Sequence, residues 1–261
     1  MLRLVQGMGA MLIQASHSAG YGVLLLGQAA LQLPFALTRR RANDIVHLLY
    51  TYTLSALPVT LVVSTFTGMI LALQSGISLE ELGQENLLGR LVATAIVREM
   101  GPVFTALILA ASIGSGVAAE IGTMRVSEEI DALEIMSISP IRFLVMPRVL
   151  ALTLICPVMT AFADIIGILG GAMVSLAQFN VSWLTYHRDA VENLAYRDVF
   201  SGLLKAVVFG LTIGLVGCTQ GLLARGGATG VGEATRRAVV SSFLLIIFFT
   251  YFISWLVYRG D

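Results

Sequence analysis

Five long stretches without a formal charge constrain this chain more than any other feature of its sequence. They run over residues 45–79, 100–119, 149–178, 206–224 and 238–258, and only Asp164 interrupts the third. Each is close to or longer than the roughly 20 helical residues that cross about 30 Å of hydrocarbon. Because backbone polar groups in lipid must be paired within the protein, we expect these stretches to be α-helices. The sequence therefore predicts an all-α integral membrane protein with five transmembrane helices.

The composition agrees with this class. Hydrophobic residues make up 57% of the chain, the mean hydropathy is +0.86, and only 12% of residues are charged. Ordinary soluble domains have about 25% charged residues. So few charges could not cover a soluble surface, which excludes a soluble enzyme, a disordered chain and a nucleic-acid binder. The 16 basic residues balance the 16 acidic ones, so the net charge indicates no acidic partner.

The segment before the first apolar stretch is more polar than the other five. Residues 4–38 carry no formal charge but include several glutamine, serine and histidine residues. We expect residues 1–41 to form an N-terminal helix that lies in the membrane interface, with a sixth crossing as the alternative. Residues 42–261 then form a five-helix transmembrane domain.

The loop arginines predict the orientation, because cytosolic loops carry an excess of basic residues. One side of the predicted topology has nine arginines: Arg39, Arg40, Arg41, Arg125, Arg142, Arg148, Arg225, Arg236 and Arg237. The other side has four: Arg90, Arg188, Arg197 and Arg259. We therefore expect a cytosolic N-terminus, a C-terminus on the opposite side, and external loops over residues 76–90 and 179–198.

The sequence offers no motif for catalysis or for a cofactor. A phosphate-binding P-loop requires a lysine after its glycines, and the single lysine, Lys205, lies inside an apolar run. The glycine-rich run over residues 226–232 lacks a preceding strand and is interpreted as a cytosolic turn. His17, His47 and His187 are too far apart to suggest a metal site. We expect a chain that is not itself an enzyme and that binds no metal.

The segment over residues 120–137 is the most informative loop. Ser127 is a candidate N-cap, and acidic residues follow it in the first turn of a predicted helix. Ile130, Leu133 and Met136 recur every three residues and predict an apolar edge, and Pro140 ends the helix. The residues alone leave two interpretations open: a solvated connector, or a helix that docks into another protein.

Several motifs in this order resemble the MlaE/YrbE permease family, the membrane subunits of ABC transporters that move lipids. The matching runs are Phe66-Thr67-Gly68-Met69, Leu71-Ala72-Leu73-Gln74, Arg98-Glu99-Met100-Gly101-Pro102-Val103, Ala118-Ala119-Glu120-Ile121-Gly122-Thr123-Met124, Glu128-Glu129-Ile130-Asp131-Ala132-Leu133, Ser139-Pro140, Pro147-Arg148, Lys205-Ala206-Val207-Val208-Phe209-Gly210, Gly232-Glu233-Ala234-Thr235 and Ala238-Val239-Val240. The resemblance covers nearly the whole chain from about residue 39 onward.

The resemblance implies a homodimeric permease in a bacterial inner membrane, with a periplasmic C-terminus. It implies a cytosolic ABC ATPase that binds ATP and Mg²⁺, a STAS-domain protein on that ATPase, and a periplasmic MCE-domain ring. The cargo would be phospholipid, moved between the inner and outer membranes to maintain outer-membrane asymmetry. Residues 120–137 would be the coupling helix, with the ATPase-coupling residues Glu120, Arg125, Glu128, Glu129, Ile130, Asp131 and Leu133.

Two positions depart from the family pattern. Many members have an arginine where this chain has Ser112, and some have an aspartate in the last span where it has Thr250. Both changes remove a charge from the membrane interior, so the family's lipid site does not transfer unchanged.

Charges inside the spans mark candidate functional residues, because a charge in lipid is costly unless it faces a cavity or a partner. Arg98 lies about 10 Å inside its span at roughly 1.5 Å per residue, and Lys205 lies at a similar depth. We expect these two residues and Glu99 to meet, with separate partners for the adjacent Arg98 and Glu99. Together with Thr250 they form the predicted lipid pathway. In one interpretation the cations bind a lipid phosphate; in the other, Glu99 and Lys205 form a structural ion pair or the cations snorkel to the headgroups. Asp164 is interpreted as structural.

Two other functions remain open from the residues. In an ion-coupled secondary transporter, Asp164 and Glu99 would relay the ion. A structural anchor for a periplasmic ring would need no transport pathway. The absence of an internal repeat argues against the first alternative.

Overall fold

The computed structural model describes residues 20, 22, 24, 25, 27 and 39–259. The predicted interfacial helix over 1–41 therefore lies almost entirely outside the described residues. Throughout the described part the regular structure is helical, with no strand. Its α-helices are α2 (Arg39–Glu80), α3 (Leu88–Ala95), α4 (Gly101–Leu109), α5 (Ser115–Val126), α6 (Glu129–Ile135), α7 (Met146–Gln178), α8 (Trp183–Glu192), α9 (Tyr196–Leu222) and α10 (Gly227–Tyr258). Short 3₁₀ or π-helical turns lie at Glu85–Leu87, Ile96–Met100, Ala110–Gly114 and Ile141–Val145.

The prediction of five membrane-spanning helices is confirmed. The spans are Asn43–Glu80, Glu85–Val126, Ile141–Gln178, Tyr196–Leu222 and Gly227–Tyr258. These helices are longer than the uncharged stretches, because each continues at one or both ends into turns that carry charged residues. At 1.5 Å per residue, each has at least the length needed to cross the hydrocarbon core. The chain is a multi-pass membrane protein.

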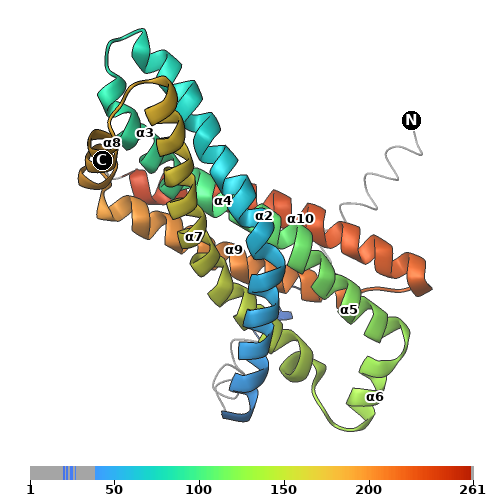
Figure 1. Cartoon of the computed structure of the whole chain (residues 1–261). Helices are drawn as coiled ribbons and strands as arrows, with labels where there is room; N and C mark the ends of the chain where they lie inside the picture. Colours follow the sequence, from blue (N-terminus) through green and yellow to red (C-terminus); the bar gives the residue numbers. More distant parts are fainter. Residues whose placement is uncertain (1–19, 21, 23, 26, 28–38, 260–261) are drawn as a thin grey trace.

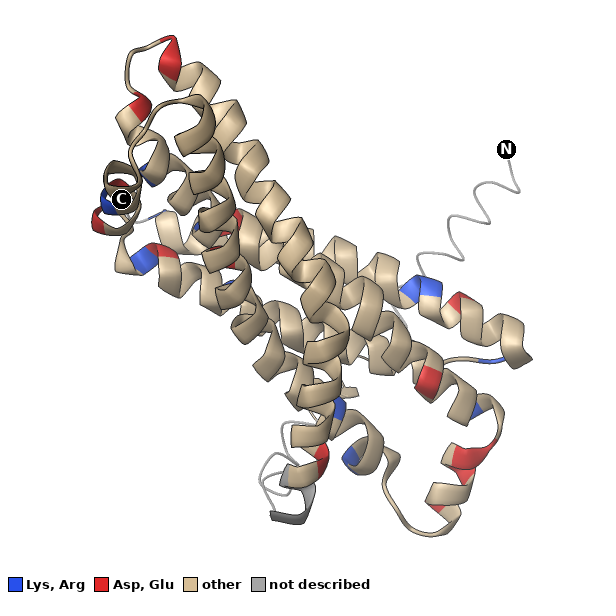
Figure 2. Ribbon diagram, viewed as in Figure 1, with Lys and Arg blue, Asp and Glu red and all other residues tan. Residues whose placement is uncertain are grey.

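Four of the spans pack in a row, side by side, and the second span contacts all of them (Figure 1). Helix α2 packs on α7, α7 on α9, and α9 on α10. The second span is a nearly continuous helix that contacts α2 and α7 through α3 and α4, and then α9 and α10 through α5. We call the two ends of the molecule the α6 end and the α8 end, after the short helices that they carry. Charged residues gather toward these ends and are sparse along the apolar spans (Figure 2).

Small residues let α2 and α7 approach each other closely. A Cβ atom on Gly68 would lie 1.8 Å from the carbonyl oxygen of Gly167, and a Cβ on Gly170 would lie 2.4 Å from that of Thr65. Transmembrane helices gain little from excluding water, so their association depends on such close backbone packing. This contact fixes α7 against α2 and, through α7, the rest of the bundle.

The structure changes the local detail of three predicted connections. The glycine-rich run at 226–232 is not a turn: α10 begins at Gly227, because left-handed backbone at Gly226 (φ +89°) reverses the chain in a few residues. The external connection predicted over 76–90 shrinks to residues 81–84, since α2 continues to Glu80 and helical structure resumes at Glu85. The loop predicted over 179–198 contains α8, which Ser182 caps by accepting a hydrogen bond from the amide of Thr185.

Substituting Gly68 tests the α2–α7 contact. In Gly68→Ala the new methyl group meets backbone rather than a flexible side chain, so we expect a loss of about 1–3 kcal/mol of stability. Gly116→Ala is the matched control, because a Cβ there meets nothing within 4 Å. Thermal unfolding of the two purified variants measures the difference, and equal midpoints would show that the glycine contact does not hold the helices together.

Candidate functional site

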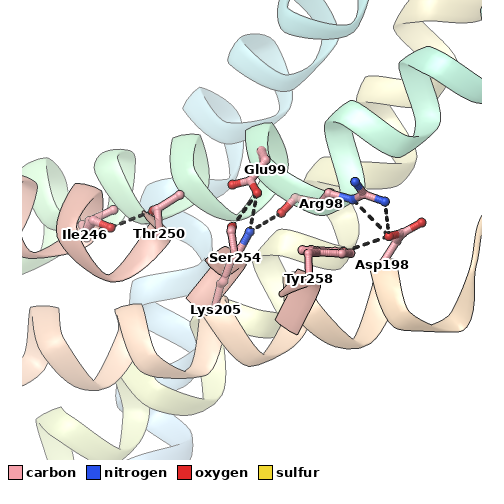
Figure 3. Close-up of polar contacts among 8 residues, drawn as sticks. All are labelled: Arg98, Glu99, Asp198, Lys205, Ile246, Thr250, Ser254 and Tyr258. Carbon is pink, nitrogen blue, oxygen red and sulfur yellow. Dashed lines mark hydrogen bonds and ion pairs between the residues drawn. The ribbon is translucent and has the colours of Figure 1, made fainter. Parts of the chain in front are cut away.

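Lys205 is the centre of a polar layer that joins three spans. Its side chain is fully buried, and its Nζ atom donates hydrogen bonds to Glu99 Oε1 at 2.7 Å and to the carbonyl oxygen of Arg98 at 2.7 Å. The hydroxyl of Ser254 on α10 donates to the same Glu99 oxygen at 2.7 Å. Figure 3 shows these groups converging from the second span, α9 and α10. A buried ammonium is tolerated in an apolar bundle because both a carboxylate and a carbonyl neutralise or solvate it.

The local backbone explains why the Arg98 carbonyl is available. Residues Ile96–Met100 form a π-helical turn, and Pro102 is the second residue after it. In a regular helix the amide of residue 102 would donate to the carbonyl of residue 98, and proline has no such amide. Lys205 supplies this carbonyl with a donor from α9. The neighbouring Val97 carbonyl also faces α9, where a Cβ on Gly202 would lie 2.3 Å from it.

A second ion pair lies beside the first. The Nε and Nη2 atoms of Arg98 donate to Asp198 Oδ1 at 3.0 and 2.7 Å, and the hydroxyl of Tyr258 donates to the same oxygen at 2.8 Å. The guanidinium also lies over the Tyr258 ring, 4.2 Å from its centroid, in a cation–π contact. Asp198 is 4% exposed, whereas Arg98 is 37% exposed. The two pairs together form what we call the charged layer: Arg98, Glu99, Asp198, Lys205, Ser254 and Tyr258.

The structure brings together three of the four residues of the predicted lipid pathway. Arg98 and Glu99 have separate partners, as expected, and the Glu99–Lys205 ion pair of the structural interpretation is present. Thr250 does not join the charged layer, since its hydroxyl donates to the carbonyl of Ile246 on its own helix (Figure 3). A role for these residues in binding a lipid headgroup stays a prediction.

Sequence reasoning missed three members of the charged layer. Asp198 precedes Lys205 by seven residues, which is two helical turns, so both project from one face of α9. That spacing is a signal that could have identified Asp198. Ser254 carries no comparable signal, because a serine hydroxyl in an apolar span usually bonds its own helix. Tyr258 carries none either, because a tyrosine at the end of a span is also typical of the membrane interface.

The predicted coupling segment is two helices rather than one. Glu120 lies in the middle of α5 and Arg125 near its end, and α6 carries Glu129, Ile130, Asp131 and Leu133. Arg125 and Asp131 form an ion pair that ties α6 to α5, and Arg148 on α7 donates to Glu120 at 3.2 Å.

The prediction that Ser127 caps this helix is wrong. Glu128 holds the N-cap position in left-handed backbone (φ 62°), and the Ser127 hydroxyl bonds Thr123 and Glu129 instead. Ile130 is 2% exposed and packs in the core, whereas Ile135 and Met136 are 85% and 61% exposed. The outward apolar surface of α6 is therefore at its C-terminal end.

The fold and the charged layer define a multi-pass membrane protein with a polar centre inside its helix bundle. Residues 45–256 match the model of the permease MlaE family. A probable ABC transporter permease of Rickettsia typhi is 40% identical over 204 residues, which cover 78% of this chain and 79% of the relative. A probable ABC transporter permease of Synechocystis is 38% identical over 206 residues, covering 78% of each chain.

A more distant relative, the chloroplastic Arabidopsis thaliana protein TRIGALACTOSYLDIACYLGLYCEROL 1, is 36% identical over 205 residues. The match covers 78% of this chain and 59% of the relative. The chain belongs to the MlaE permease family, which confirms the resemblance, and it is an ABC transporter permease.

Removing the Lys205 ammonium tests the charged layer. Lys205→Met removes the counter-charge of the Glu99 carboxylate, which keeps only the Ser254 hydroxyl, and removes the α9 donor of the Arg98 carbonyl, so we expect a loss of about 3–5 kcal/mol of stability. The double variant Glu99→Gln/Lys205→Met should recover part of it. The control Arg188→Met breaks the exposed Arg188–Glu192 pair and should cost at most about 1 kcal/mol. A double-mutant cycle on thermal unfolding gives the coupling, and a coupling near zero would contradict the pairing.

Proposed function

We propose that this chain is the permease subunit of an ABC transporter that moves phospholipid between the inner membrane and a periplasmic MCE-domain carrier, and so maintains outer-membrane lipid asymmetry. The observation that carries the proposal is the partial exposure of the charged layer. Arg98 and Glu99 are 37% and 30% exposed within apolar spans, while their partners Asp198 and Lys205 are buried. A charge that opens toward lipid needs a polar ligand, and a phospholipid headgroup supplies a phosphate for the guanidinium.

The geometry favours Arg98 over Lys205 as the residue that meets the phosphate. Both hydrogen-bond partners of the Lys205 ammonium come from the second span, and none of its surface is exposed. Arg98 uses its Nε and Nη2 atoms for Asp198. Lys205 then holds Glu99 and the π-helical turn in place, and Arg98 contacts the lipid. The Arabidopsis relative bears the name of a glycolipid, which favours a lipid cargo.

The α6 end supports coupling to a cytosolic ABC ATPase. An ABC transporter permease works with an ATPase, and this chain has no P-loop lysine, so ATP and Mg²⁺ bind the partner. The exposed Ile135 and Met136, with acidic residues on the same short helix, give α6 an apolar and charged surface for that contact. A STAS-domain protein would bind the ATPase, and the α6 end would face the cytosol.

A second copy of this chain would complete the permease as a homodimer. In the most apolar part of α10 only 11% of the residues are buried, the smallest share among the five spans. Large apolar side chains cover its outer surface, including Leu244, Phe248 and Tyr251. The charged layer includes two α10 residues, Ser254 and Tyr258, so a partner packed on α10 would lie next to the proposed lipid site.

The α6 contact is tested by adding a charge to its exposed apolar surface. We expect Ile135→Asp to abolish co-purification of the ATPase with the permease, because the carboxylate would be buried in the interface. The matched control is Leu184→Asp on α8, which is 74% exposed at the opposite end. Retention of the ATPase by Ile135→Asp, or its loss from Leu184→Asp, would place the contact elsewhere.

The lipid site is tested with the reconstituted complex. We expect Arg98→Gln to slow ATP-dependent transfer of a fluorescent anionic phospholipid by about tenfold or more, since one charge-assisted contact is lost. Arg188→Gln, which alters an exposed arginine on α8, should transfer at the wild-type rate. Normal transfer by an assembled Arg98→Gln complex would remove Arg98 from the lipid pathway.

A further inference from the structure

Asp164 has a buried carboxylate oxygen that the charged layer does not use. It is the only charged residue between positions 149 and 178, in the middle of α7. Its Oδ1 atom is buried and has no hydrogen-bond partner among the described residues. Burying an oxygen atom that accepts no hydrogen bond costs free energy. The presence of Asp164 at this buried position therefore calls for a role that offsets this cost.

The atom that Oδ1 faces is the α-carbon of Gly101. A Cβ on Gly101 would lie 1.7 Å from Oδ1 and 2.9 Å from Cγ of Asp164. Only glycine leaves room for this contact, in which a Cα–H group points at a carboxylate oxygen. Gly101 is the first residue after the π-helical turn Ile96–Met100 and directly precedes Pro102. The carboxylate therefore contacts the backbone where the turn returns to regular helix.

The surroundings of Asp164 offer little room for a ligand. The cavity beside it has a volume of about 10 Å³, and its lining includes Ser64, Met100 and Gly101. Such a volume holds at most a single water molecule. Three residues further along α7, Gly167 also packs closely on the second span, since a Cβ there would lie 3.2 Å from the Ile96 side chain.

We propose that Asp164 is a positioning residue that acts through its shape: its carboxylate oxygen sets the place of Gly101. The π-helical turn ends at Met100, directly before Gly101, so this contact fixes the rotation at which the side chains of Arg98 and Glu99 project from the second span. That rotation decides whether they meet Asp198 and Lys205 on α9. The inference rests on the proposed lipid-transport function, and it assigns Asp164 no ion or proton to carry.

If Asp164 acts through its shape, substitutions at Asp164 and Gly101 should give different results than if it acts through its charge. Asp164→Asn keeps an oxygen at the Oδ1 position, so it should transfer lipid within about twofold of the wild-type rate. Gly101→Ala places a methyl group on that oxygen and should lower transfer by about tenfold or more. In Gly101→Ala/Asp164→Ala the new methyl occupies the space that the carboxylate leaves, so transfer should exceed that of either alanine variant alone.

The experiment uses the permease assembled with its ATPase in liposomes, with transfer of a fluorescent phospholipid as the readout. Ser112→Ala, in the second π-helical turn, is the control and should have no effect, because its hydroxyl bonds only its own helix. If the Gly101→Ala permease does not assemble with its ATPase, the yield of assembled complex replaces transfer as the readout. The double variant Gly101→Ala/Asp164→Ala should then recover assembly. The proposal is overturned if Asp164→Asn transfers as poorly as Asp164→Ala, or if the double variant is no better than Gly101→Ala.

A second readout separates this inference from the proposed function. Hydrogen exchange of backbone amides over residues 96–104 should speed up in Asp164→Ala and stay unchanged in Asp164→Asn. This measurement does not depend on transport. A wild-type complex that transfers no phospholipid, together with this exchange pattern, would contradict the proposed function and leave the positioning role supported. Equal exchange in the two variants would contradict the positioning role.

Discussion

The buried ammonium of Lys205 is the interaction on which the rest of the charged layer depends. It bonds Glu99 and also the Arg98 carbonyl, which Pro102 leaves without its usual helical donor. One side chain from α9 thus compensates a backbone defect in the second span and neutralises a carboxylate there. Without it, the Glu99 carboxylate would keep only the Ser254 hydroxyl as a donor and would lose its counter-charge, and the Arg98 carbonyl would lose its donor from α9. Both losses are costly inside an apolar bundle.

Two of the four charged residues in the charged layer are buried, and the other two are partly exposed. Lys205 and Asp198 are buried and hold the two spans together, whereas Arg98 and Glu99 are each held on one side and open on the other. The proposed lipid pathway needs this combination, because a polar group must be presented to a headgroup without unfolding the helix that carries it. Tyr258 and Ser254 bring α10 into the same layer, so a movement of any of the three spans changes what Arg98 can contact.

Hydropathy predicted the five spans because the cost of unpaired backbone in lipid leaves few alternatives to long apolar helices. The meeting of Arg98, Glu99 and Lys205 could be predicted, because the rise per residue gives Arg98 and Lys205 similar positions along their spans. The partner of Arg98 was missed because a pair between Asp198 and Arg98 depends on the rotation of two helices, which the π-helical turn alters. The glycine-rich run was taken for a turn because glycine is a poor helix former in isolation, yet only Gly226 and Gly227 have positive φ there. The halves of the coupling segment could not be separated, since the break at Glu128 depends on a single left-handed residue.

The central claim is that the open side of the charged layer receives a phospholipid headgroup. Photocrosslinking with a phospholipid that carries a reactive group in its headgroup, applied to the full complex in a bilayer, tests it most directly. The account predicts that the label attaches to peptides that contain residues 96–104 and 250–258, and that Arg98→Gln lowers this labelling. Labelling spread over the outer faces of the spans, with no preference for these peptides and no effect of Arg98→Gln, would contradict the account.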